Sequence, residues 1–307
     1  MAKIKIREVG PRDGFQDLDV VIPTGLKVEL IDRLSEAGLP YIEVGSFVSE
    51  RHPLYRKLGD TAEVYKQITK KDGTKYCALV PISNYYHNAV DAGFRDIAVF
   101  VSANEEHNMK NVRRSIDESI QEINKIKSMA QKNDVDVRLY IVTAFGYRNP
   151  DDVPLDRLKN VVSSTVETAG PFLFLCGGCD VPPLVRNVYE ISLGDTFGLA
   201  TPEEIRKRSR CADLIEYGKP EIALHFHQGN PDVWKYNITV AIEECGITVL
   251  DSSLCGFGGC PTDKRTGNIP TEQLLDYLEF NNHNTGVDVD EVHRISEFLR
   301  NELKKLV

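Results

Sequence analysis

The stretch DIAVFVSANEEHNMKNVRRSIDESIQEINKIKSMAQKNDVDVRLYIVTAF, residues 96–145, contains one copy of the pattern that decides the fold. Two short runs rich in β-branched and aromatic residues begin at Asp96 and Asp136, and a longer segment lies between them. In that segment apolar residues recur every three or four positions, which places them on one face of a helix. These residues are Met109, Val112, Ile116, Ile120, Ile123, Ile126 and Met129. The stretch therefore predicts a strand–helix–strand unit of a parallel sheet.

The same alternation continues in both directions along the chain. The strand candidates are IKIREV from Ile4, YIEVGS from Tyr41, KYCALV from Lys75, DIAVFV from Asp96, DVRLYIVTAF from Asp136, YEISLGD from Tyr189, EIALHFH from Glu221 and ITVLDS from Ile247. Eight such units favour an α/β fold of the closed (β/α)8 TIM-barrel type over an open sheet. A length of 307 residues without a linker or low-complexity tract suits one barrel domain, residues 1–307.

A final amphipathic segment follows the eighth unit. Its apolar residues, again three or four positions apart, are Val292, Ile295, Leu299, Leu303 and Leu306. We expect this C-terminal extra helix to pack on the outside of the barrel.

Composition limits the classes of function. The formal net charge is −9, and the Lys and Arg residues are scattered, which argues against a nucleic-acid partner or an anionic membrane surface. No apolar run approaches the roughly 18 to 20 residues of a spanning helix, and no signal-peptide core follows the N-terminus. Seven irregularly spaced cysteines do not suggest a secreted disulfide framework. We expect a cytoplasmic protein with reduced thiols.

Polar residues gather at the predicted C-terminal ends of the strands, where TIM-barrel active sites lie. They follow strands one, two, six, seven and eight, within the segments GPRDGFQ, IEVGS, GDT, HFH and CGFGGCPTDKRTGN. In chain order they are Arg12, Asp13, Gln16, Glu43, Asp195, Thr196, His225, His227, Cys260 and Asn268. We expect Gln16, Asp195 and Thr196 to contact the substrate.

The strongest single signal is the sequence His225-Phe226-His227. Alternate residues of a strand share a face, so both histidines are predicted to point into the barrel, and Leu224 and Phe226 toward the surrounding helices. Two imidazoles there could bind one metal ion together with Asp13. The alternative is a pair of hydrogen-bonded core histidines.

The acidic candidates also have purely structural interpretations. Arg12 and Asp13 could form an ordinary surface ion pair in a turn. Glu43 could be a carboxylate in a polar layer inside the barrel, and Asp195 could cap the next helix. Their joint position beside the two histidines favours the functional interpretation.

Several segments together resemble the 3-hydroxy-3-methylglutaryl-CoA lyase family of the metal-dependent lyase and Claisen-synthase TIM-barrel superfamily. These are VGPRDGFQD, IEVGSFVS, SIDES, YEISLGDTFGLATP, HFH, DSS, GFGGCP and TGNIPTE. The resemblance covers nearly the whole chain. Phe15 and the GGCP loop favour the lyase branch over the synthases.

The resemblance implies a set of roles for the candidates. Asp13, His225, His227 and Asn268 would hold Mg²⁺ or Mn²⁺, and Arg12, Glu43 and Cys260 would be catalytic. A 3-hydroxy-3-methylglutaryl-CoA-like substrate would be cleaved to acetyl-CoA and a keto acid, acetoacetate. The family also implies a homodimer.

The residue types suit this chemistry. Cleavage needs the tertiary hydroxyl of the substrate deprotonated, and the base would be Asp13 or a histidine such as His225. Arg12 would stabilise the enolate that leaves, in the manner of an oxyanion hole. Cys260, on a glycine-rich loop suited to a mobile lid, would then protonate the enolate carbon.

The chain departs from the family pattern in three places. Gln228 stands where the lyases have an acidic residue, and the loop TAFGYRNPDD after the fifth strand lacks their cysteine. The irregular stretch PFLFLCGGCDVPPLVRN carries Cys176 and Cys179, a C-x-x-C pair with no second pair to complete a zinc site. The exact acyl group therefore stays open.

Two alternative functions follow. The first is a sister enzyme of the same superfamily: a citramalyl-CoA or longer-chain hydroxyacyl-CoA lyase, a 4-hydroxy-2-oxoacid aldolase, or an acyl-CoA Claisen synthase. The second is a non-catalytic metal-binding protein. Mere metal binding needs none of Arg12, Glu43 and Cys260, so their presence speaks against the second.

Overall fold

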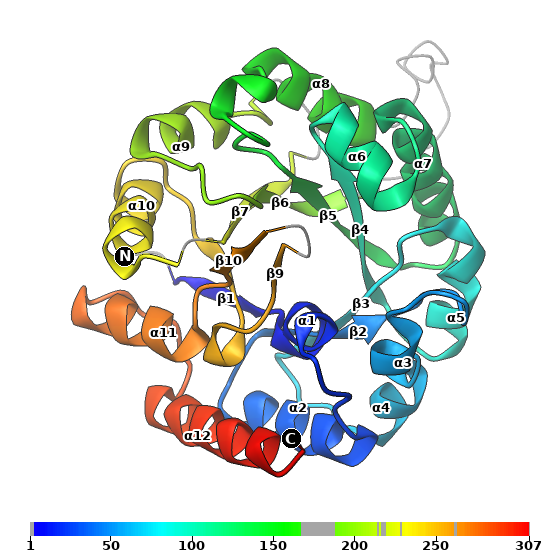
Figure 1. Cartoon of the computed structure of the whole chain (residues 1–307), viewed down its shortest axis with the longest axis vertical. Coiled ribbons are helices and arrows are strands. Elements are labelled where there is room, and N and C mark those ends of the chain that lie inside the picture. Colours follow the sequence, from blue (N-terminus) through cyan, green and yellow to red (C-terminus); the bar gives the residue numbers. More distant parts are fainter. Residues whose placement is uncertain are drawn as a thin grey trace, which may run out of the picture.

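A computed structural model describes residues 3–166, 188–213, 215, 219–227, 229–260 and 263–306 of the chain. Eight parallel strands follow one another around a closed barrel in the order of the sequence (Figure 1). They are β1 (Lys5–Glu8), β2 (Tyr41–Ser46), β3 (Lys75–Leu79), β4 (Asp96–Ser102), β5 (Asp136–Val142), β6 (Val188–Asp195), β7 (Glu221–Phe226) and β8 (Val249–Ser252). β8 pairs with β1 in register from Lys5 opposite Val249 to Glu8 opposite Ser252. The predicted TIM barrel is confirmed.

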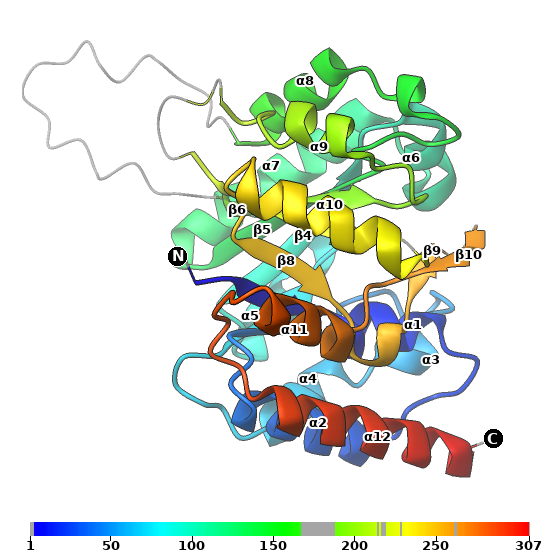
Figure 2. The ribbon, with the colours of Figure 1, turned by 90° about the vertical axis from the view of Figure 1, so that its left-hand side faces the viewer.

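Helices form a ring around the strands (Figures 1 and 2). They are α1 (Phe15–Asp17), α2 (Thr24–Glu36), α3 (Tyr55–Leu58), α4 (Thr61–Gln67), α5 (Tyr86–Asp91), α6 (Glu105–Val112), α7 (Ile116–Lys132), α8 (Leu155–Val166), α9 (Pro202–Arg208), α10 (Pro231–Glu243), α11 (Thr271–Phe280) and α12 (Val289–Leu306). The extra helix is α12, which packs on α2 and α11 outside the barrel. No helix among the described residues has the length and apolar character needed to cross a membrane.

The predicted helix face from Met109 to Met129 is divided between two helices. Arg113 adopts a left-handed conformation with φ 57° and ends α6. Ser115 then starts α7 with a capping box, in which its side chain accepts from the backbone of Glu118 and that glutamate accepts in return. The prediction that all seven apolar residues lie on one face of a single helix is therefore wrong, and Met109 is 47% exposed.

Two further differences from the sequence prediction lie at the C-terminal ends of strands. β5 ends at Val142, because Thr143 has φ 58° and turns the chain out of the strand. The glycine-rich segment after β8 includes a small antiparallel pair, β9 (Gly259–Cys260) and β10 (Asp263–Gly267). In Figure 1 this pair lies over the centre of the barrel. The stretch carrying Cys176 and Cys179 lies outside the described residues, as does Gln228.

The barrel interior is polar along much of its length. Arg138 on β5 and Glu190 on β6 form an ion pair, and Arg138 also pairs with Asp251 on β8. All three side chains are completely buried. Aliphatic side chains dominate most TIM barrels at this place. Here the apolar core lies instead between the strands and the helices.

Candidate active site

Asp13, His225 and His227 converge at the C-terminal end of the barrel. Leu224 and Phe226 on β7 are buried in the core between strands and helices, so the alternation turns His225 to the inside, as predicted. The Nε2 atoms of His225 and His227 lie 2.7 Å apart. One ligand atom from each histidine and one carboxylate oxygen of Asp13 all lie within 4.8 Å of one another. The three residues therefore face a shared point.

The protonation states of this cluster suit a cation. Burial alone would raise the pKa of the Asp13 carboxyl, but Arg12 and the two histidines outweigh burial, so this pKa lies below its usual value. Burial, together with the neighbouring His225, lowers the pKa of His227 to about 4. The set offers an ionised carboxylate and a neutral imidazole, which are the forms that bind metal ions. These residues fit a divalent cation.

Asn268 lies against the same carboxylate. Its Nδ2 atom donates to Asp13 Oδ2 at 2.7 Å and to the carbonyl of Phe257 at 2.9 Å. A metal ligand would instead present the amide oxygen, which half a turn of the amide brings to this side. The predicted proximity is confirmed, and the ligand role of Asn268 stays a prediction.

Arg12 and Asp13 lie on a π-helical turn, Gly10–Gly14, directly after β1. The guanidinium of Arg12 donates through Nε to Glu43 Oε2 at 2.8 Å and through Nη1 to Asp13 Oδ1 at 2.5 Å. Arg12 is only 7% exposed and Asp13 only 5%, which excludes the interpretation as a surface ion pair. The guanidinium of Arg12 therefore lies in a fixed orientation beside Asp13, a candidate metal ligand.

Glu43 is completely buried behind Arg12. Its Oε2 atom accepts from Arg12 and, at 3.1 Å, from the hydroxyl of Tyr140. Burial raises the pKa of Glu43, and Arg12 only partly offsets this. Glu43 thus belongs to the polar interior and also orients Arg12, and its catalytic role stays a prediction.

The three residues expected to contact substrate make contacts within the protein. Gln16 donates to Asp13 Oδ1 at 2.8 Å, so it helps to orient that carboxylate. Asp195 accepts from the backbone of Leu199 at 2.7 Å, and Thr196 accepts from the backbone of Thr143 at 2.9 Å. Their substrate contacts stay predictions.

The helix that follows β6 is capped by another residue than expected. Thr201 is the N-cap of α9, and its side chain accepts from the backbone of Glu204. The interpretation of Asp195 as the cap of that helix is therefore wrong.

The glycine-rich loop after β8 lies directly on the ligand candidates. Gly258 has φ +95°, and a methyl group added to it would lie 2.6 Å from Asn268 Nδ2 and 2.9 Å from Asp13 Oδ2. Only glycine fits this close approach. Cys260 follows two residues later, in β9, although its side chain lies outside the described atoms. Its catalytic role stays a prediction.

Glu8, at the end of β1, binds the glycine-rich loop after β8 to the barrel through hydrogen bonds. Its Oε1 atom accepts from the backbone of Gly10 at 2.7 Å and of Leu254 at 2.9 Å, and its Oε2 atom accepts from Thr271 at 2.6 Å. Burial raises the pKa of Glu8 to about 7, although these hydrogen bonds oppose it. The turn that carries Asp13 and the loop that covers it therefore share one anchor.

Cys255, five residues before Cys260, is directed elsewhere. Its sulfur lies 3.6 Å from the hydroxyl of Ser296 on α12. Burial raises the pKa of this thiol to about 11. Cys255 therefore has the character of a structural thiol.

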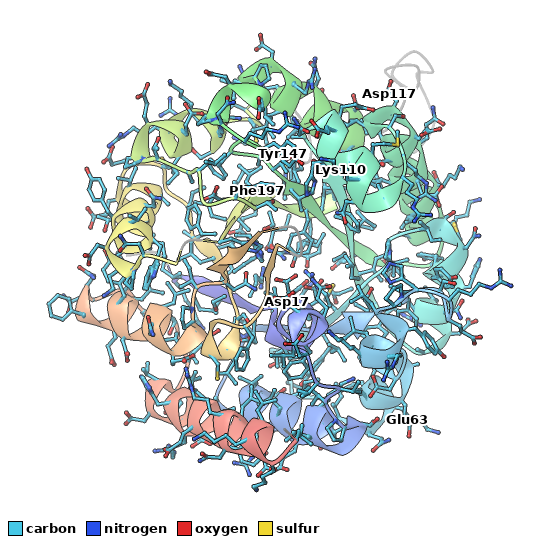
Figure 3. The ribbon with its side chains drawn as sticks, in the orientation of Figure 1. Asp17, Glu63, Lys110, Asp117, Tyr147 and Phe197 are labelled. Atoms are coloured by element: carbon cyan, nitrogen blue, oxygen red, sulfur yellow. The ribbon has the colours of Figure 1, made fainter. Side chains whose placement is uncertain are left out.

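Aromatic residues form part of the rim of the barrel mouth. Tyr147 after β5 and Phe197 after β6 lie 5.0 Å apart between ring centres, and His107 on α6 packs edge-on against both. Figure 3 shows Tyr147, Phe197 and Lys110 grouped near α6, while Asp17 lies near α1. The cysteine-free loop thus supplies an aromatic ring to the rim.

Two residues around the site escaped the sequence analysis. Tyr140 contacts Glu43, and Asp251 contacts His225 through Nδ1 at 3.1 Å. Polar residues at every second position of a strand give the available signal, since Arg138 and Tyr140 alternate with aliphatic residues in β5.

Comparisons with known proteins agree with this geometry. The chain matches the HMGL-like family over residues 3–299. It is 36% identical to the cytoplasmic 3-hydroxy-3-methylglutaryl-CoA lyase of Mus musculus, over 98% of this chain and 82% of that protein. The crystal structure of the Bacillus subtilis HMG-CoA lyase superimposes with a TM-score of 0.83 at 34% identity, covering 98% of this chain and 94% of that one.

A second solved structure was determined with ligands. It is an HMG-CoA lyase from Acinetobacter baumannii in complex with coenzyme A and 3-methylmalate, with a TM-score of 0.78 at 27% identity, covering 97% of this chain and 90% of that one. A barrel with two histidines and an aspartate at its mouth, matched over nearly its whole length, leaves one assignment: the chain belongs to the HMGL-like family of carbon–carbon lyases.

Proposed function

We propose that this protein cleaves 3-hydroxy-3-methylglutaryl-CoA, or a closely similar hydroxyacyl-CoA, to acetyl-CoA and acetoacetate in a metal-dependent reaction. The observation that carries the proposal is the convergence of Asp13, His225 and His227 beside the buried guanidinium of Arg12. Membership of the HMGL-like family supports the reaction class. The related lyase solved with coenzyme A supports a coenzyme A thioester as substrate.

Asp13, His225 and His227 would hold Mg²⁺ or Mn²⁺, with the amide oxygen of Asn268 as a fourth ligand. The bound cation would lower the pKa of the substrate hydroxyl. The proton would pass to Asp13 or to a histidine of the cluster. The bond between C2, next to the thioester carbonyl, and C3, which carries the hydroxyl, would then break. Its electron pair would pass to the thioester enolate.

Arg12 would stabilise the negative charge that develops on the enolate oxygen. Glu43 fixes one edge of the guanidinium through Nε and Nη2, at 2.8 and 2.7 Å. Because Glu43 orients the guanidinium before the reaction, stabilising the negative charge of the enolate needs little reorganisation of the protein. Cys260 would return a proton to C2 and complete acetyl-CoA. Gln16, Asp195 and Thr196 would bind the substrate.

A direct assay tests this proposal. The purified protein is incubated with 3-hydroxy-3-methylglutaryl-CoA, and acetyl-CoA and acetoacetate are measured with Mg²⁺, with Mn²⁺ and with excess chelator. We expect equal amounts of the two products, and loss of activity with chelator. A panel with citramalyl-CoA, longer hydroxyacyl-CoAs and 4-hydroxy-2-oxoacids separates the sister enzymes. No turnover of any of these, with metal bound, would favour a non-catalytic protein.

We propose a homodimer of single-domain chains in the cytoplasm. Cys77, Cys211, Cys245 and Cys255 are free thiols among the described residues, which suits a reducing compartment. Light scattering on the purified protein tests the dimer, and a fluorescent fusion tests the compartment.

A further inference from the structure

Asp251 is a buried carboxylate beside the metal site that the mechanism above does not use as a ligand. It lies on β8, and its side chain is completely buried inside the barrel. Its Oδ1 atom accepts from Arg138 Nη2 at 2.5 Å. Its Oδ2 atom lies 2.9 Å from the hydroxyl of Ser192 and 3.1 Å from Nδ1 of His225. The carboxylate thus has a partner for each oxygen.

The contact with His225 decides which ring nitrogen carries the proton. A carboxylate that is paired with Arg138 accepts hydrogen bonds and donates none. The Nδ1 atom of His225 must therefore carry the hydrogen that points at Asp251. Nε2 is left with its lone pair, and it faces His227 Nε2 at 2.7 Å. This is the tautomer that a metal ligand needs.

A chain of buried ion pairs holds Asp251 in place on the side away from His225. Arg138 bridges it to Glu190, and Glu190 accepts from Arg7 Nη2 at 2.5 Å. The chain of alternating charges runs across β1, β5, β6 and β8. Because Arg138 and Ser192 hold the buried Asp251 carboxylate, it would keep its orientation if the imidazole of His225 rotated.

We propose that Asp251 is a positioning residue of the metal centre, which fixes the tautomer and the ring orientation of His225 through Nδ1. The inference rests on the metal site proposed above and names a residue that acts on it from outside the ligand set. Partners of this kind change metal affinity by about 10- to 100-fold when they are removed.

Asp251→Asn tests the role with almost no change of shape. An amide has one acceptor oxygen, and Arg138 competes for it with His225. If the oxygen turns to Arg138, the NH₂ group faces Nδ1 of His225 and favours the opposite tautomer, which has a hydrogen on Nε2. We expect the affinity for Mn²⁺, measured by titration calorimetry, to fall 10- to 100-fold.

Glu190→Gln is the matched control. It removes one carboxylate charge from the same buried network, but it does not touch His225. We expect its Mn²⁺ affinity to stay within about threefold of the wild type, even where its melting temperature falls as far as that of Asp251→Asn. Equal loss of affinity in both variants, or wild-type affinity in Asp251→Asn, would overturn the proposal.

The tautomer of His225 can also be measured in the wild-type protein, where the result does not depend on whether a variant folds. Long-range ¹H–¹⁵N correlation spectra of histidine-labelled, metal-free protein identify which ring nitrogen is protonated, and loss of a signal in His225→Gln assigns it. Protonation of His225 at Nδ1 is expected, and protonation at Nε2 contradicts the role of Asp251. If the wild type binds no Mn²⁺, the proposed metal site is refuted, and the role of Asp251 with it. If the wild type binds Mn²⁺ and Asp251→Asn binds it equally well, only the role of Asp251 is refuted.

Discussion

Gly258→Ala adds a single methyl group at the point where the glycine-rich loop meets the ligand candidates. That carbon would lie 2.9 Å from Asp13 Oδ2 and 2.6 Å from Asn268 Nδ2, whereas ordinary contacts begin at 3.4 Å. One group has to move by about 0.5 Å or more, and metal–ligand distances tolerate only about 0.2 Å. We expect the affinity for Mn²⁺ to fall at least tenfold, which is about 1.4 kcal/mol.

The backbone contribution to this variant needs its own control. Gly258 has φ +95°, so alanine there also costs about 1–2 kcal/mol of folding stability from the left-handed conformation. Gly246 has φ +69° and nothing within 4 Å of an added methyl group, so Gly246→Ala carries the backbone cost alone. Calorimetric titration with Mn²⁺ and thermal melting are measured on both. Wild-type Mn²⁺ affinity in Gly258→Ala would refute the close approach of loop and ligands.

Five further substitutions, one of them the control Cys255→Ser, test the site and its surroundings. Arg12→Lys keeps the charge but cannot contact Glu43 and Asp13 with one planar group, so steady-state kinetics should show kcat reduced at least about 100-fold and KM changed far less. His227→Ala should abolish metal-dependent turnover while the far-ultraviolet circular dichroism spectrum stays that of the wild type. Cys260→Ser should keep Mn²⁺ and substrate affinity but lose much of kcat, since a hydroxyl is the weaker acid, whereas Cys255→Ser should retain activity. Glu8 has a pKa raised by burial to about 7, so the folded protein holds a proton there that the unfolded chain releases at the ordinary glutamate pKa of 4.5. Stability from this group is present at low pH and is lost as pH rises toward 7. Denaturant titrations should therefore show wild type losing roughly 2–3 kcal/mol against Glu8→Gln from about pH 5 to about pH 8, and a constant difference would contradict the raised pKa.

The eight strands were predictable because each one repeats the same local pattern. Short β-branched runs alternating with helical periodicity leave few folds other than a parallel barrel. The boundaries were less accessible, since Arg113 and Thr143 adopt positive φ values although neither is glycine. A non-glycine residue in that conformation gives no signal in composition. The break between α6 and α7 and the end of β5 were therefore missed.

The ligand cluster was predictable for a different reason. A strand has a period of two, so His225 and His227 had to share a face, and all strand ends of a parallel barrel meet at one mouth. The partners that orient the cluster come from other strands. Tyr140 reaches Glu43 across the interior, and Asp251 reaches His225 from β8. Such contacts depend on the register of the closed barrel, which a single sequence does not specify.

The position of Arg12 between two carboxylates would link the proposed binding of the metal to the proposed stabilisation of the enolate. Its guanidinium contacts Asp13, a ligand candidate, on one edge and Glu43 on the other. A cation bound to Asp13 would weaken the hold of this carboxylate on Arg12, so Nη1 of the guanidinium would become available to the substrate oxygen while Glu43 keeps the orientation of the group. Glu43 is fully buried and cannot turn toward solvent, so it is suited to this task. If the proposed metal site is correct, the charges imply an order of events: Arg12 would be engaged by the protein before the cation binds, and it would become available to the substrate afterwards.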